Sequence, residues 1–279
     1  MTATATAACI MGWPVEHSRS PLIHGHWLRH HGIAGAYRRE AVRPEAFPGF
    51  LATLAERGYV GGNVTMPLKE LALELSEPDA RARAVAAANT LWLEEGRLRS
   101  TNTDVEGFIA SLDEAAPGWE LDLEKAVVIG AGGAARAAVH GLIERRVAEI
   151  VVVNRTLARA EALRAHFGPR VHPASFEALP AALDGAGLIA NASALGMHGH
   201  PDPAWDLAPM RADAVVAEAV YAPLETSLLK AARARGMRAA DGLAMLLHQA
   251  GGGFERWFGV RPEVTPELRA LVEREVLGK

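Results

Sequence analysis

The chain has 279 residues, 49% of them hydrophobic, and a formal net charge of −4. This length can bury two separate cores, so we expect two domains. Acidic and basic residues are interspersed, and the sequence lacks the basic stripe that a nucleic-acid partner requires. It contains neither an apolar run of about 18 residues nor a charged, then apolar, N-terminal segment, which predicts a cytoplasmic protein with no membrane partner.

Short apolar runs alternate with longer amphipathic stretches in the first hundred residues. The expected strands are 8–12, 36–42 and 58–64, and the expected helices are 21–31 and 44–57. This alternation predicts a mostly parallel sheet covered by helices. Residues 90–93 and 97–101 are expected to form a hairpin, because the Glu-Gly between them suits a tight turn.

A helix over 105–115 leads into a second alternation. Its expected strands are 125–129, 149–153, 187–190, 214–219 and 237–239. Two final helices, 244–257 and 266–277, have no strand between them and are expected to return to the first domain. The sequence therefore predicts an α/β protein of two domains. One is mostly parallel, over 1–104 plus 245–279, and the other is a doubly wound Rossmann domain over 105–244.

A glycine-rich turn joins strand 125–129 to the helix that follows. Its residues are Gly130, Ala131, Gly132, Gly133, Ala134 and Ala135. They match the G-x-G-x-x-G/A pattern of dinucleotide-binding folds, in which the first glycine makes the turn and the second lets backbone approach the pyrophosphate. N–H groups at the start of a helix favour an anion. A tight turn without a ligand is the alternative interpretation.

The end of the next strand indicates which dinucleotide would bind. An acidic side chain about 20 residues after the glycines would hold a free ribose 2′-hydroxyl, but Asn154, Arg155 and Thr156 stand there. The donor fork of Arg155 suits a 2′-phosphate, Thr156 adds a hydroxyl, and Arg159 can reach the same side. This pattern favours NADP. Taken singly, each arginine is better explained as an ordinary solvated charge at the start of a helix.

Polar clusters lie where the predicted strands end or helices begin. They are Ser18-Arg19-Ser20, Asn63 to Lys69, Asn89-Thr90 and Asn102 to Asp104. Singly, Lys69 reads as a solvated lysine, Asp104 as a helix cap and Ser20 as an N-cap before proline. Together they lie at the sheet edge where ligands bind. A lysine that exchanges a proton, an aspartate that holds it and a dinucleotide that carries hydride can interconvert an alcohol and a ketone.

These motifs together resemble the shikimate dehydrogenases. The resemblance runs nearly end to end and is carried by residues 12–24, 63–69, 102–104, 130–135, 154–156 and 241–250. It implies reversible, NADP-dependent reduction of 3-dehydroshikimate to shikimate, in the pathway to chorismate and the aromatic amino acids. It also implies that the first domain holds the substrate and the catalytic residues, and that the Rossmann domain holds NADP.

The resemblance also implies a role for each site residue. Ser18 and Ser20 would donate to the substrate carboxylate, with Tyr221 nearby. The ring hydroxyls would be bound by Asn63, Thr65, Asn89, Asp104 and Gln249. Lys69 would be the acid/base, because an ammonium can stabilise or protonate the oxygen on which charge develops, and Asp104 would orient it. Which of the two moves the proton stays open. The nicotinamide end would meet Ala219, Gly242 and Met245.

Some positions depart from the family pattern. Val105 stands where glycine is common, Ala194 where serine is usual, and Glu218-Ala219 replaces an aspartate followed by a larger apolar residue. Quinate or an aminated shikimate therefore remains an alternative substrate. A non-catalytic, NADP-sensing regulatory protein is the alternative of another class, and the retention of Lys69 and Asp104 favours the enzyme.

The sequence predicts no metal site. The chain has 11 histidines, some of which cluster at His24 to His31 and at His198-Gly199-His200, but no carboxylate or cysteine stands at ligand spacing around either cluster. Hydride transfer assisted by a lysine also needs no metal. The expected partner is a small-molecule substrate, and monomer and homodimer both remain open.

Overall fold

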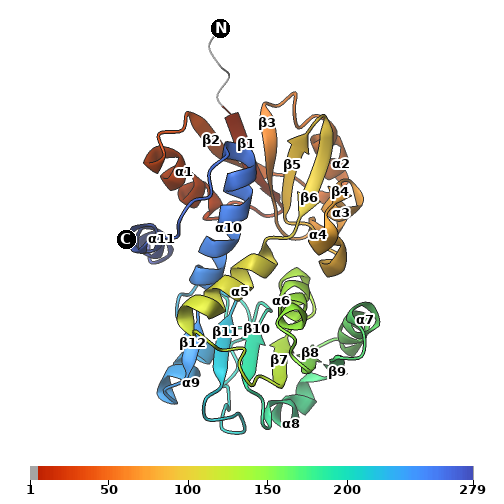
Figure 1. Ribbon diagram of the computed structural model, residues 1–279, viewed down its shortest axis with the longest axis vertical. Helices are drawn as coiled ribbons and strands as arrows, with labels where there is room; N and C mark the ends of the chain where they lie inside the picture. The colour runs from red at the N-terminus through yellow and green to blue at the C-terminus, as the bar shows by residue number, and fades with distance from the viewer. Residues whose placement is uncertain (1–5, 279) are drawn as a thin grey trace. The chain divides into compact units, whose positions relative to one another are not determined.

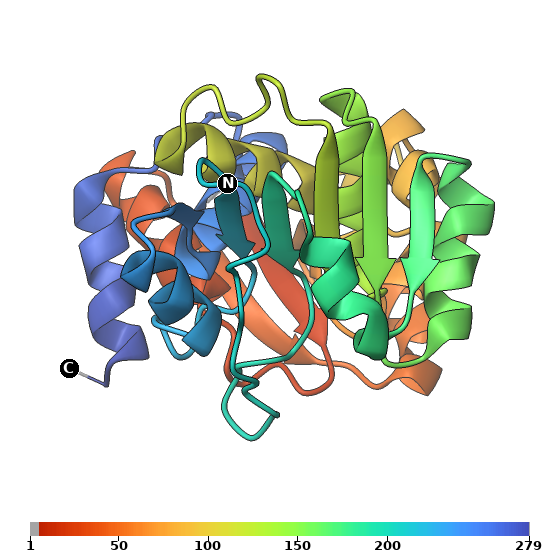
Figure 2. The same ribbon diagram turned by 90° about the horizontal axis from the view of Figure 1, so that it is seen from below.

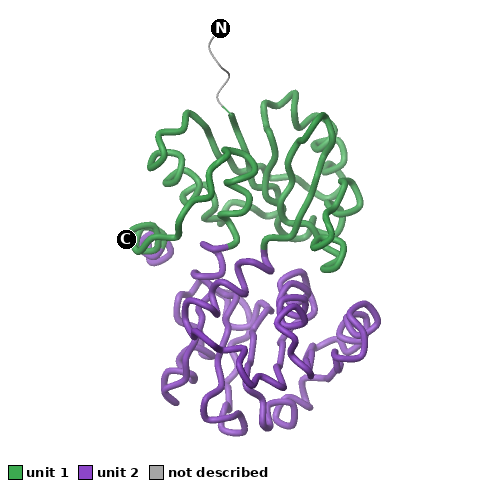
Figure 3. The backbone as a smooth tube through the Cα atoms, in the orientation of Figure 1, with its two compact units in different colours: residues 1–103, 249–272 green, residues 104–248, 273–279 purple. Residues whose placement is uncertain are grey.

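The structure is a computed structural model that describes residues 6–278 and contains two six-stranded sheets (Figure 1). Each sheet belongs to its own compact unit (Figure 3). Unit 1 consists of the described chain up to Thr103 together with Gln249–Val272. Unit 2 consists of Asp104–His248 and the described residues from Glu273 onward. The predicted α/β fold class is confirmed.

The sheet of unit 1 is mixed. Its strands run in the order β2 (Gly35–Ala41), β1 (Thr6–Gly12), β3 (Tyr59–Val64), β5 (Thr90–Glu94), β6 (Arg97–Thr101) and β4 (Glu77–Pro78). β1 is parallel to both β2 and β3, whereas β5 is antiparallel to β3 and β6. The predicted hairpin is confirmed, with Glu95 and Gly96 both at positive φ, as a two-residue turn of the primed kind requires.

Both faces of the first sheet are covered. Successive side chains of β1 point to opposite faces, and those on each face are buried in a core. Cys9 and Met11 join a core with Phe47, while Ala8 and Ile10 join another. The unit's helices are α1 (Ser20–His30), α2 (Phe47–Ala52), α3 (Lys69–Glu74), α4 (Ala80–Val85), the end of α10 (Gly242–Phe258) and most of α11 (Pro266–Val276).

The long helix expected over 44–57 is wrong in extent. It is a 3₁₀ turn, Pro44–Ala46, followed by the short α2, which ends at Ala52. Thr53 follows as the C-cap, and its hydroxyl donates to the carbonyl of Gly49, 3.1 Å away. This side-chain bond competes with continuation of the backbone ladder.

The sheet of unit 2 is entirely parallel. Its strands run in the order β12 (Arg238–Ala240), β11 (Val215–Glu218), β10 (Leu188–Asn191), β7 (Lys125–Ile129), β8 (Glu149–Val153) and β9 (Val171–Ala174). This is the doubly wound order: from β7 the chain adds strands on one side of the sheet, and from β10 it adds strands on the other. Ligands of such sheets bind beyond the carboxyl ends of the strands where the side changes.

Helices cover both faces of the second sheet, as Figure 2 shows. Val128 and its neighbours on one face pack with α5 (Asp104–Ala115), α6 (Gly133–Glu144) and α7 (Leu157–Phe167). Val127 and its neighbours on the other face pack with α8 (Leu179–Leu183) and α9 (Ser227–Ala234). No helix among residues 6–278 is long and apolar enough to cross a membrane.

Candidate active site

A buried amide on β3 is the centre of a hydrogen-bond network in unit 1. Asn63 is 3% exposed, and its Oδ1 accepts from the hydroxyl of Tyr37 at 2.6 Å. Its Nδ2 donates to the carbonyl of Asn89 at 3.2 Å and to Oγ1 of Thr90 at 3.1 Å. Because Nδ2 faces a carbonyl, which can only accept, the amide is held in a single orientation. Its nitrogen thus donates to two acceptors within the protein.

The same network fixes the segment that leads to Asp104. Asn89 Oδ1 accepts from the backbone N–H of Thr103 at 2.8 Å, and Asn89 Nδ2 donates to Thr103 Oγ1 at 3.0 Å. Asn102 Nδ2 donates to the carbonyl of Ala87 at 2.9 Å. Asp104 follows directly as the first residue of α5 and is 8% exposed. A carboxylate at this end of a helix is favoured by the helix dipole.

Lys69 is placed by the turn after β3. The backbone N–H of Thr65 donates to the carbonyl of Met11, 2.9 Å away, which ties this turn to the end of β1. Lys69 is the first residue of α3, and its carbonyl accepts from the N–H of Ala88 at 2.9 Å. The lysine backbone is therefore bonded to the residue that precedes Asn89. The structure thus gathers Thr65, Lys69 and Asn89 at one corner of the first sheet.

The serine loop follows β1. Ser20 is 3% exposed and its N–H donates to Ser18 Oγ at 3.3 Å. Arg39 donates to the carbonyl of Ser18 through Nε and Nη2, at 3.1 and 2.7 Å. The N-cap expected at Ser20 is wrong by one residue, because α1 already includes Ser20 and its cap is Arg19, without a side-chain cap bond.

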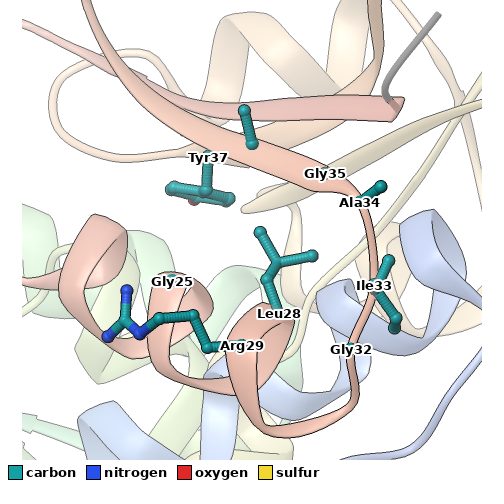
Figure 4. A pocket seen from close by; sticks show the side chains of 9 residues that line it. Gly25, Leu28, Arg29, Gly32, Ile33, Ala34, Gly35 and Tyr37 are labelled. Carbon is teal, nitrogen blue, oxygen red and sulfur yellow. The ribbon is translucent and has the colours of Figure 1, made fainter.

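A depression in unit 1, between α1 and β2, does not belong to this cluster. Figure 4 shows its lining by Leu28, Arg29, Ile33 and Tyr37 together with glycines and alanines. Arg29 is its only charged lining residue. None of the predicted site residues lines it, and it offers no acid/base pair.

The glycine turn of unit 2 fits a dinucleotide. Gly130 has φ +108°, and a Cβ there would lie 2.9 Å from the carbonyl oxygen of Ala192, so a side chain is excluded. Gly132 is the N-cap of α6, makes no side-chain cap bond, and a Cβ on it would meet nothing within 4 Å. The N-cap position of α6 therefore borders open space and has no capping side chain. Backbone N–H groups arranged in this way suit a pyrophosphate.

The turn after β8 contains the residues that are predicted to bind the 2′-phosphate of NADP. Asn154 Nδ2 donates to the carbonyl of Thr156 at 2.8 Å and shapes the turn. Arg155, Thr156 and Arg159 are exposed, and within residues 6–278 neither arginine has an acidic partner. Two guanidinium groups lie at the end of a strand that no acidic side chain follows directly. This arrangement is suited to binding an anion.

Glu218 lies at the carboxyl end of β11, where the nicotinamide end of NADP is expected. Its carboxylate accepts from Asn191 Nδ2 at 2.8 Å, from the N–H of Val220 at 2.9 Å and from Thr226 Oγ1 at 2.8 Å. Burial raises the pKa of Glu218, and these hydrogen bonds oppose the rise. The two ends of the loop that contains Tyr221 are thereby tied to Glu218 at the end of β11, and Asn191 ties Glu218 to β10. A small cavity here is lined in part by Ala219 and Met245. Gly242 is the first residue of α10.

The structure divides the predicted site residues between the two units. Unit 1 contains Ser18, Ser20, Asn63, Thr65, Lys69, Asn89 and Gln249, whereas Asp104, Tyr221 and the predicted cofactor residues belong to unit 2. Sequence reasoning missed Tyr37 as a member of the network. Tyr37 stands in an alternating strand, where a tyrosine ordinarily indicates core packing. Among residues 6–278, no group of three or more His, Cys, Asp or Glu side chains could hold a metal ion.

The doubly wound sheet and its glycine turn define the class of dinucleotide-binding α/β proteins. Residues 10–91 match the family described as shikimate dehydrogenase substrate binding domain, and residues 112–196 match shikimate / quinate 5-dehydrogenase. The chain is 59% identical to a shikimate dehydrogenase (NADP(+)) of Rhodopseudomonas palustris strain TIE-1, over 100% of both chains. It is 58% identical to one of Afipia carboxidovorans, again over 100% of both. This chain belongs to the shikimate dehydrogenase family.

Solved structures agree with this assignment. The quinate dehydrogenase of Corynebacterium glutamicum in complex with NAD superposes with a TM-score of 0.88 at 30% identity, covering 96% of this chain and 98% of that one. The shikimate 5-dehydrogenase of Thermus thermophilus in complex with NADP(H) and shikimate gives 0.81 at 34% identity, covering 98% and 100%. The family resemblance predicted from the sequence motifs is confirmed.

Proposed function

We propose that this protein catalyses the reversible, NADP-dependent reduction of 3-dehydroshikimate to shikimate, a step of chorismate and aromatic amino acid biosynthesis. The observation that carries the proposal is the match, over the full length of both chains, to relatives named shikimate dehydrogenase (NADP(+)). The candidate reacting groups, Lys69 and Asp104, are both present in this chain.

The substrate is bound by the polar residues around the first sheet. Ser18 and Ser20 donate to the carboxylate, assisted by Tyr221. The ring hydroxyls are bound by Asn63, Thr65, Asn89, Asp104 and Gln249. Support comes from the network itself, because a ring of fixed hydroxyl and amide groups can recognise a small polyhydroxy acid.

Lys69 is the acid/base of the proposed mechanism. NADPH, when bound, supplies the hydride that reduces the ketone carbon. Negative charge then grows on the substrate oxygen, and the Lys69 ammonium stabilises it and donates a proton. In the reverse direction the lysine takes the proton back. Asp104 orients the ammonium and accepts from a neighbouring substrate hydroxyl.

The cofactor is held by the second sheet's carboxyl edge. The backbone from Gly130 to Ala134 faces the pyrophosphate at the start of α6. The 2′-phosphate is bound by Asn154, Arg155, Thr156 and Arg159. Ala219, Gly242 and Met245 approach the nicotinamide end. The absence of an acidic residue after β8 supports NADP over NAD.

The test is a turnover assay that follows NADPH in both directions, with 3-dehydroshikimate or with shikimate. Lys69→Ala should lower kcat by about 10²- to 10⁴-fold, the usual contribution of a general acid/base. Lys125→Ala is the matched control, since the amine of Lys125 donates to the carbonyl of Asp184 in unit 2. Absence of turnover by the native protein, with NADP binding intact, would instead favour the non-catalytic NADP sensor.

Quinate is the second candidate substrate, favoured by the TM-score of 0.88 to a quinate dehydrogenase in complex with NAD. The kcat/KM values for shikimate and quinate, each with NADP and with NAD, decide between them. The proposal expects the pair of shikimate and NADP to give the highest value.

We also infer a cytoplasmic location, because the proposed reaction draws on the pools of NADPH and of biosynthetic intermediates. Cell fractionation with activity measurement tests this location. Light scattering of the purified protein distinguishes a monomer from a homodimer.

A further inference from the structure

We propose that Tyr37 is a positioning residue for the substrate site, whose hydroxyl holds Asn63 in the orientation that receives the substrate. This inference rests on the proposed function, because it assigns Tyr37 a part in shikimate binding. Tyr37 lies on β2 and is 8% exposed, and it is not one of the residues expected to touch the substrate.

The direction of the Tyr37 hydrogen bond follows from the neighbours of Asn63. Asn63 Nδ2 must face the carbonyl of Asn89, because a carbonyl only accepts. Oδ1 therefore faces Tyr37, and the phenol has to donate its single proton to it, over 2.6 Å. Burial raises the pKa of Tyr37 well above 10, so the group stays a neutral donor at physiological pH.

Ser20 is the second polar neighbour of this hydroxyl. The Ser20 side chain lowers the pKa of Tyr37 and so opposes part of the rise caused by burial. Tyr37 is therefore linked to two residues of the proposed substrate site, because its hydroxyl donates to Asn63 and its pKa responds to Ser20.

An aromatic stack fixes the position of the Tyr37 ring. His24 of α1 stacks on it, with ring centroids 4.0 Å apart and planes 16° apart. Phe254 of α10 stacks against His24 at 5.9 Å and 10°. Within the described chain, neither ring nitrogen of His24 makes a hydrogen bond of acceptable geometry. His24 therefore acts here as a neutral aromatic plate, and Tyr37 keeps its ring in place without its hydroxyl.

The experiment compares Tyr37→Phe with the native protein in the shikimate and NADP assay. The variant keeps the stacked ring and loses only the oxygen, so it should fold. We expect KM for shikimate to rise about 3- to 10-fold, the range of one net hydrogen bond. KM for NADP and kcat should stay within about 2-fold, because a defect in positioning the ground-state substrate falls on KM.

Tyr59→Phe is the matched control. Tyr59 is a buried tyrosine of the same sheet, but its hydroxyl donates to Glu40 and has no part in the Asn63 network. Its loss should leave KM for shikimate unchanged. A lower thermal midpoint of Tyr37→Phe with an unchanged KM for shikimate would overturn the proposal, since packing alone predicts that result.

A double-mutant cycle tests whether Tyr37 acts through Asn63. In an Asn63→Ala background, Tyr37→Phe should have little further effect on KM for shikimate, because the bond that it removes is already absent. Full additivity of the two changes would contradict the proposed route. If the native protein does not turn over shikimate, the proposed function is wrong. If the native protein is active but the Tyr37→Phe variant has the native KM for shikimate, only the proposal for Tyr37 is wrong.

Discussion

At the scale of single residues, His24 links the aromatic stack to acid stability. It is fully buried, and desolvation lowers its pKa to about 3, although the nearby Asn63 side chain opposes part of the shift. Below the ordinary pKa of 6.5 the unfolded chain binds a proton here that the folded chain does not. The stability from this group is therefore complete above pH 6.5 and is lost as the pH falls toward 3.

We predict that His24→Phe flattens the acid side of the stability profile. The native free energy of unfolding should fall by up to about 1.4 kcal/mol per pH unit from this group, and the phenylalanine variant lacks that term. Urea unfolding of both proteins at several pH values between 7 and 4 measures the two slopes. Equal slopes would show that His24 accepts a proton in the folded state.

At the scale of elements, the β7–α6 turn contains two glycines that are needed for different reasons. The sequence motif identified both, because the pattern follows a strand and precedes a helix. It could not supply the steric reason for Gly130, since the carbonyl of Ala192 that excludes a side chain follows β10, far along the chain. Contacts between distant segments depend on the sheet order, which local patterns do not fix.

We predict opposite outcomes for Gly130→Ala and Gly132→Ala. The first should cost roughly 1–3 kcal/mol of folding free energy, from its positive φ and the close carbonyl. The second should change stability by less than about 1 kcal/mol, because its Cβ meets nothing and its φ is ordinary. Its KM for NADP should rise, because the methyl group projects where the pyrophosphate is proposed. Thermal unfolding and NADP titration separate the two effects.

Element boundaries show what the sequence could predict. Strands 125–129 and 149–153 agree with β7 and β8, because buried parallel strands appear as continuous β-branched runs. β9 was missed, since it has four residues, includes Pro173 and lies at the sheet edge, where proline is tolerated. In the site, the polar motifs were found, but the partner of Asn63 on β2 was not.

At the scale of the whole molecule, the two sheets have separate cores. The cores of unit 1 contain residues such as Phe47, and those of unit 2 residues such as Ile150. The predicted domain division and the assignment of one ligand to each remain predictions. Ligands that bind only the folded state stabilise the part that they contact.

We predict that shikimate and NADP protect different backbone amides from hydrogen exchange. Shikimate alone should slow exchange around Thr65 and Asn89 in unit 1, and NADP alone around Gly132 and Arg155 in unit 2. Peptide-resolved exchange with each ligand measures this. Protection of only one unit by both ligands would contradict the proposed division of binding.

At the proposed substrate site, the hydrogen bonds that the amide of Asn63 already makes determine which ligand group it can accept. Because the nitrogen already donates to two acceptors inside the protein, we expect the side chain to offer an incoming molecule a lone pair of its oxygen. A ligand must therefore bring its own proton to this point. Analogues in which the matching hydroxyl is methylated or replaced by fluorine would present an acceptor to an acceptor, so inhibitors of this protein should retain a donor there.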